Sequence, residues 1–169
     1  LTIIADLAKK YDAYVITDEV YEHIVYEPYQ HVYMASLPGM FERTISCSSL
    51  SKTYSITGWR LGYIIAPEEI IERAKKVHDF LTVGAAAPLM EAAVVGLQMG
   101  DDYYKDLLDV YSSKRTLFLN GLDRLGIQHS KPEGAYYVML DVSEFKGYAN
   151  DVEFCEKLAE KVGVGAVPG

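Results

Sequence analysis

Hydrophobic residues recur along the first third of the chain at spacings that predict one helix followed by strands. An amphipathic helix is predicted by apolar residues one helical turn apart, namely Leu1, Ile4, Leu7, Ala8 and Tyr11. The apolar run at 13–17 is typical of a buried parallel strand. Runs at 44–48 and 61–66 predict two further strands. Residues 27–43 predict a loop with a helical turn, and 49–58 predict a loop or a strained turn. The sheet is therefore expected to gather in residues 13–66.

The later residues predict mainly helices. Pro67 suits the first position of a helix, and the acids that follow it suit the positive end of the helix dipole. A second helix is predicted at 88–99, and a long third one at 103–125, where Gly126 ends it. A strand is predicted at 135–142. Asn150, with Glu153 three residues later, predicts the start of a helix that runs to about residue 162.

These elements predict an α/β fold with a mostly parallel sheet and flanking helices. The long helix has the length of a connector between domains, and the pattern after residue 127 is typical of an α+β subdomain. The chain has 169 residues, starts without Met and ends in an apparent strand and turn, so we expect a fragment of a longer protein.

Composition excludes several classes of function. The net charge is −8, which argues against a nucleic-acid surface. No apolar run reaches the roughly 18 residues of a membrane span, and neither a signal peptide nor a dinucleotide fingerprint is present. Two cysteines and four histidines show no metal-binding spacing, so no metal is expected. Free thiols suggest a reducing, cytoplasmic setting.

One lysine stands in a setting suited to chemistry. Lys52 follows a buried-looking strand, in a run from residue 46 to 59 that holds almost no other charge. Desolvation would lower its pKa and make its amine a better nucleophile toward an aldehyde. Ser49, Ser51 and Arg60 surround it in sequence and are suited to binding a phosphate. Each has a structural alternative: a surface lysine, two turn residues and a salt-bridged arginine.

A second group follows the first predicted strand. Asp18 lies at its carboxyl end, where ligands bind in open α/β sheets. A carboxylate there can pair with a protonated pyridine nitrogen, and Tyr21 can donate to a phenolic oxygen of the same ring. The alternatives are a helix N-cap for Asp18 and a core aromatic for Tyr21. Glu19 and Glu22 are interpreted as solvated or structural.

Together these residues resemble the class I/II aminotransferases, enzymes of fold type I that depend on pyridoxal phosphate. The match covers nearly the whole chain. It is carried by Ser49-Leu-Ser-Lys52-(x)2-Ser55-Ile-(x)-Gly58-(x)-Arg60-Leu-Gly62, by Asp18-Glu-Val-Tyr21 and by Pro132-Glu-Gly-Ala-Tyr136-Tyr137.

The resemblance implies roles for these residues and a domain arrangement. Lys52 would form the Schiff base with pyridoxal 5'-phosphate and act as the base at the substrate α-carbon. Asp18 would pair with the ring nitrogen and Tyr21 with O3′, while Ser49, Ser51 and Arg60 would bind the phosphate. Residues 1–126 would form the second half of the large cofactor-binding domain with its connector helix. Residues 127–169 would begin the small C-terminal domain.

The expected activity is transfer of an amino group between an amino acid and a 2-oxo acid, by a homodimer in the cytoplasm. The substrate-carboxylate arginine and the ring-stacking aromatic would lie outside the chain, so the fragment alone is expected to be nearly inactive. Two alternatives stay open. One is a carbon–sulfur lyase or cyclopropane-forming synthase of the same fold, and the other is an aminotransferase-like sensor domain of a transcription regulator.

Overall fold

The computed structural model describes residues 1–169 and contains one small sheet and five helices. The strands are β1 (Val15–Asp18), β2 (Thr44–Ser49) and β3 (Gly62–Ile65), in the order β1-β2-β3. β1 and β2 are parallel, and β2 and β3 are antiparallel. The helices are α1 (Thr2–Lys10), α2 (Glu68–Thr82), α3 (Ala87–Leu97), α4 (Asp101–Leu125) and α5 (Asp151–Val162).

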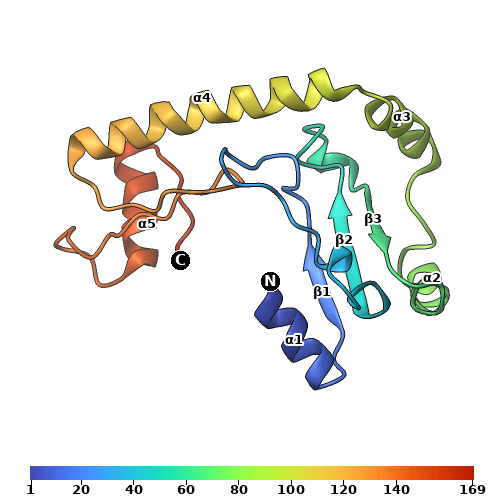
Figure 1. The fold of residues 1–169 in the computed structure, drawn as a ribbon. Helices are drawn as coiled ribbons and strands as arrows, with labels where there is room; N and C mark the ends of the chain where they lie inside the picture. Colours follow the sequence, from blue (N-terminus) through green and yellow to red (C-terminus); the bar gives the residue numbers. More distant parts are fainter.

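The long helix α4 sets the shape of the molecule. Figure 1 shows the sheet and α1–α3 toward one end of α4 and α5 beneath its other end. The segment after α4 turns back toward the sheet before it reaches α5 (Figure 1). None of the helices is both long and apolar enough to cross a membrane. This arrangement places the segment after α4 beside the loops that follow β1.

Local signals explain where the helices begin and end. Pro67 occupies the N-cap of α2, and α4 ends at Gly126, whose φ of 69° is the left-handed conformation that glycine adopts without strain. At α5 the Asn150 side chain accepts a hydrogen bond from the Glu153 amide at 3.0 Å. The Glu153 carboxylate in turn accepts one from the amide of Ala149 at 2.7 Å. The predicted N-cap pair is thereby confirmed.

β3 runs antiparallel to β2, because the loop at 50–61 returns the chain to the sheet without an α-helical crossover. One predicted element is absent from the structure. Residues 135–142 form no strand and make only one isolated bridge, between His129 and Leu140. A strand requires a partner along its length, and this segment meets only the short stretch at 128–130, so the prediction was wrong.

Two small apolar clusters support the sheet. One is formed by buried residues of α1 and of the segment between β1 and β2, namely Ala5, Ala8, Met34 and Met40. The other consists of Leu50, Leu61 and Ala93, with Tyr54, Ile56 and Leu89 packed against it. The second cluster fastens the loop between β2 and β3 to α3. It therefore supports the loop that carries Lys52.

Candidate active site

A cavity of about 520 Å³ opens at the carboxyl end of β1 and β2. Asp18 is the last residue of β1 and Ser49 the last of β2, and parallel strands end at the same edge of a sheet. The lining includes five of the six residues singled out from the sequence, namely Asp18, Ser49, Ser51, Lys52 and Arg60. Residues spread over 43 positions of the chain are thus brought to one hollow.

The lysine-bearing loop is held in shape by its own hydrogen bonds. The carbonyl of Ser51 accepts from the Ile56 amide at 3.1 Å and from Thr57 Oγ1 at 3.3 Å. Arg60 Nη1 donates to the carbonyl of Thr57 at 2.9 Å. Ser55 and Arg60 have φ values of 56° and 57°, which few non-glycine residues adopt. The predicted strained turn is present, and it fixes the backbone on both sides of Lys52.

Lys52 meets tyrosines instead of an apolar wall. Its side chain is half-buried, and Nζ lies 5.6 Å from the centroid of the Tyr136 ring, within the range of a cation–π contact. A hydrogen bond with Tyr136 raises the pKa of Lys52 and outweighs the opposing effect of desolvation. The prediction of a lowered pKa for Lys52 was therefore wrong.

Tyr21 is the one predicted residue that does not line the cavity. Its hydroxyl donates to Tyr137 Oη at 3.2 Å, and its ring packs edge-on against Tyr136 with the centroids 5.1 Å apart. Burial, followed by the hydrogen bonds to these two neighbours, raises the pKa of Tyr21 well above its usual range. Tyr21 is therefore a neutral donor, and its contact with a cofactor oxygen stays a prediction.

Asp18 already has a local partner. Its Oδ1 accepts from the Val20 amide at 3.2 Å, a turn in which aspartate commonly stabilises the chain after a strand. The side chain is exposed at the cavity. After burial, the Asp18 charge is the second cause that raises the pKa of the neighbouring Cys47 thiol. The carboxylate can thus support the turn with one oxygen and present the other to a ligand.

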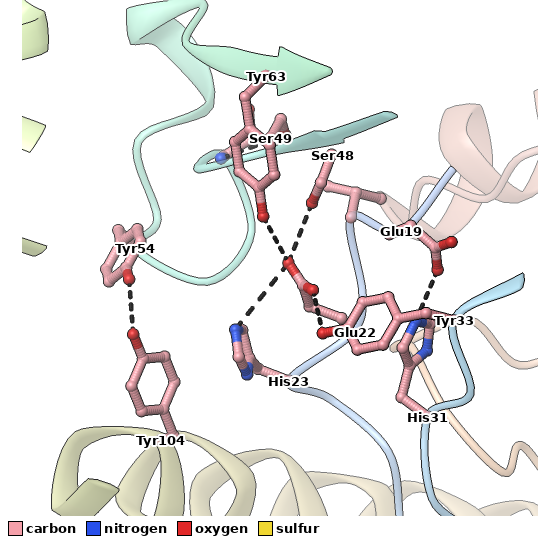
Figure 2. Close-up of polar contacts among 12 residues, drawn as sticks. Glu19, Glu22, His23, His31, Tyr33, Ser48, Ser49, Tyr54, Tyr63 and Tyr104 are labelled. Atoms are coloured by element: carbon pink, nitrogen blue, oxygen red, sulfur yellow. Dashed lines mark hydrogen bonds and ion pairs between the residues drawn. The ribbon is translucent and has the colours of Figure 1, made fainter. Parts of the chain in front are cut away.

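Glu22 fastens the segment after β1 to the rest of the sheet. Figure 2 shows its carboxylate at the centre of a polar cluster. Oε1 accepts from Ser48 Oγ at 3.1 Å and from Tyr63 Oη at 3.0 Å, while Oε2 accepts from Tyr33 Oη at 2.5 Å. Ser48 lies in β2 and Tyr63 in β3, so one side chain joins three segments. Glu22 is structural, and it holds the segment next to Tyr21 against β2 and β3.

Glu19 is structural as well. It is almost fully buried, and its Oε2 lies 2.6 Å from His31 Nε2 (Figure 2). Its amide donates to the carbonyl of Cys47 at 2.7 Å, which continues the β1–β2 pairing by one residue. No group of three or more His, Cys, Asp or Glu side chains in the chain is arranged to hold a metal ion.

A family model for class I and II aminotransferases matches residues 1–169. The chain belongs to this aminotransferase family. Members of the family depend on pyridoxal phosphate, and the donor set of the cavity fits that cofactor. It offers an amine for the aldehyde, a carboxylate for the pyridine nitrogen, and hydroxyl and guanidinium groups for the phosphate.

Individual aminotransferases are similar to the chain along almost its full length. It is 36% identical over 158 residues to the methionine aminotransferase of Escherichia coli (strain K12). This match covers 94% of the present chain and 41% of the relative. It is 36% identical over 168 residues to the aspartate aminotransferase of Pyrococcus abyssi, covering 98% and 43%. The solved N-succinyldiaminopimelate aminotransferase from Mycobacterium tuberculosis superposes with a TM-score of 0.91 at 35% identity, covering 98% and 43%. The aminotransferase chain thus spans less than half the length of these relatives.

Proposed function

We propose that the complete protein containing this chain is a pyridoxal-phosphate-dependent aminotransferase that moves an amino group between an amino acid and a 2-oxo acid. The observation that supports it best is the meeting of Lys52, Asp18, Ser49, Ser51 and Arg60 in one cavity. The family membership supports the same reaction class. The three relatives named above act on different amino acids by name, so the amino donor is left to experiment.

The chain's own residues suggest a division of labour. Pyridoxal phosphate, when bound, supplies an electron sink for negative charge at the substrate α-carbon. Lys52 holds it through the amine and moves the proton at the α-carbon. Asp18 carries the negative charge that favours a protonated ring nitrogen. Ser49, Ser51 and Arg60 bind the phosphate by charge-assisted hydrogen bonds, and Tyr21 donates to O3′.

We further propose the larger arrangement. Residues 1–126 are the second half of a large cofactor-binding domain, and residues 127–169 begin a small domain. The complete protein works as a cytoplasmic homodimer. The chain alone is nearly inactive, because it spans less than half of the length of its relatives.

The test uses the complete protein loaded with pyridoxal phosphate. Borohydride reduction followed by peptide mass spectrometry should place the cofactor on Lys52. Lys52→Ala should lose this adduct and the visible absorbance, whereas Lys10→Ala, on the exposed end of α1, should retain both. An adduct on another lysine would overturn the assignment.

A second assay separates transfer from elimination. With amino donors and 2-oxoglutarate, new glutamate supports aminotransfer. Release of ammonia or pyruvate without glutamate would instead indicate a lyase.

A further inference from the structure

Lys52 lies at one side of a cluster of tyrosines that come from three different parts of the chain. The ring of Tyr136, in the segment after α4, lies beside Lys52 Nζ. It also packs against Tyr21 at 5.1 Å, against Tyr137 at 5.1 Å and in a stack on Tyr111 of α4 at 5.7 Å between centroids. The sequence pattern assigned no site role to Tyr136, because nothing local links this segment to the lysine loop.

The backbone holds Tyr136 in this place. The amide of Ala135 donates to the carbonyl of Ile24 at 2.8 Å, and the amide of Tyr26 donates to the carbonyl of Glu133 at 2.9 Å. The Tyr26 hydroxyl adds a bond to the carbonyl of Ala135 at 2.7 Å. Ala135 has a φ of 58°, a conformation that persists in a non-glycine residue only when its surroundings fix it. Tyr136 is thus positioned by bonds on its N-terminal side.

The surroundings of this cluster shift the pKa values of Tyr21 and Tyr136 in opposite directions. Burial and its neighbours raise the pKa of Tyr21, whereas the Lys52 ammonium, followed by the Tyr21 hydroxyl, lowers the pKa of Tyr136. Neighbouring groups whose pKa values are driven apart commonly divide proton donation and acceptance between them. Tyr136 is the member of the cluster that can take a negative charge opposite Lys52.

Two cations of α4 also face this region. Lys114 and Arg115 line a small cavity of about 230 Å³ that Tyr136 also lines. Lys114 Nζ, however, lies over the ring of Tyr111 at 5.6 Å, and the Arg115 guanidinium lies over Tyr26 at 4.7 Å. Arg115 Nε also donates to the carbonyl of Pro132 at 2.9 Å. Both have partners of their own, which leaves Lys52 as the cation paired with Tyr136.

We propose that Tyr136 is a positioning residue for Lys52, whose phenol holds the lysine amine at the cavity and exchanges one proton with it. The proposal rests on the role of Lys52 in the proposed function. In the exchange an N–H bond of the Lys52 ammonium breaks and an O–H bond forms on the Tyr136 phenolate. The nitrogen keeps the electron pair and becomes a neutral, nucleophilic amine. The reverse transfer restores the ion pair.

The first test measures Tyr136 itself in the cofactor-free complete protein. Ultraviolet titration of the tyrosinate band should show a tyrosine that ionises below the others, and this step should vanish in Tyr136→Phe but persist in Tyr137→Phe. Lys52→Met should move the step to higher pH, while Lys114→Met should leave it in place. An early step unchanged by Lys52→Met, or the absence of any early step, would overturn the proposal. The Lys52→Met arm keeps Tyr136 intact, so it decides the matter even where Tyr136→Phe folds poorly.

The second test measures Lys52. The rate at which the cofactor-free protein captures pyridoxal phosphate follows the fraction of neutral amine. Because Tyr136 has the largest effect among the groups that raise the pKa of Lys52, the rate profile of Tyr136→Phe should shift to lower pH, and that of Tyr137→Phe should shift less. Identical profiles for wild type and Tyr136→Phe would refute the proton exchange. If the two profiles are identical but capture still occurs at Lys52, the aminotransferase assignment stands. If no capture occurs at Lys52, that assignment is refuted. The tyrosinate titration then still reports on the Lys52–Tyr136 pair.

Discussion

Replacing Glu22 by alanine should destabilise the protein by about 3 kcal/mol, on the basis of three hydrogen bonds to a charged acceptor. Such bonds contribute about 1.5–3 kcal/mol each when their partners cannot find water. The Glu22 side chain is only 10% exposed and Ser48 is 9% exposed, so the Ser48 hydroxyl would stay unpaired. Tyr33 and Tyr63 are 41% and 39% exposed, so their hydroxyls can turn to solvent. The loss of these two hydrogen bonds therefore adds little to the cost of the substitution. The expected cost is therefore well below the sum of three full bonds.

The assay is urea unfolding of the cofactor-free complete protein, followed by circular dichroism, with hydrogen exchange to locate the effect. Glu22→Ala should lower the unfolding midpoint at an unchanged slope and speed exchange in residues 20–26. Glu42→Ala, on an exposed carboxylate of the same part of the chain, should stay within about 0.5 kcal/mol of wild type. In the double variant Glu22→Ala/Tyr63→Phe, the loss of unfolding free energy should be about 1 kcal/mol smaller than the sum of the two single losses. A loss under about 1 kcal/mol for Glu22→Ala would show that the Glu22 hydrogen bonds do not hold this segment.

Three further predictions concern the strand turn, the last helix and the cavity. Gly62→Ala would place a methyl group 2.8 Å from the Ser48 carbonyl oxygen, so a loss of about 1–3 kcal/mol is expected. Gly58→Ala meets no atom within 4 Å and should be close to neutral in the same unfolding assay. Asn150→Ala removes the acceptor for the Glu153 amide and should cost about 1 kcal/mol, with faster hydrogen exchange at the start of α5. No change in exchange there would contradict the capping role. Asp18→Asn keeps the hydrogen bond from the Val20 amide but loses the negative charge. Cofactor trapping on Lys52 should therefore persist while turnover falls about 10- to 100-fold. Unchanged turnover would refute the role proposed for Asp18.

The sequence predicted those features that neighbouring residues determine. The helix that ends at Gly126 and the helix that begins at Asn150 are fixed by caps only a few residues away. The same holds for the turn around Lys52, where hydroxyl and glycine residues cluster. Asp18 and Ser49 could be placed together because parallel strands end at one edge.

Features that depend on distant contacts could not be predicted. The segment at 135–142 has the composition of a strand, but whether it forms one depends on a partner that lies elsewhere in the chain. The charge state of Lys52 depends on Tyr136, and Tyr21 and Tyr137 are 116 residues apart in sequence yet share a hydrogen bond. Glu22 likewise becomes a central acceptor only once β2 and β3 bring Ser48 and Tyr63 beside it.

The hydrogen bonds between residues 24–26 and 133–135 have a mechanical consequence. They attach the start of the C-terminal segment to the sheet, although the chain reaches that segment only after the 25-residue helix α4, about 37 Å long. Tyr136 lies in the segment of the chain that leads to α5, but its backbone is held in place with the sheet. A rotation of residues 143–169 can therefore pivot beyond this attachment and leave the phenol beside Lys52 undisturbed.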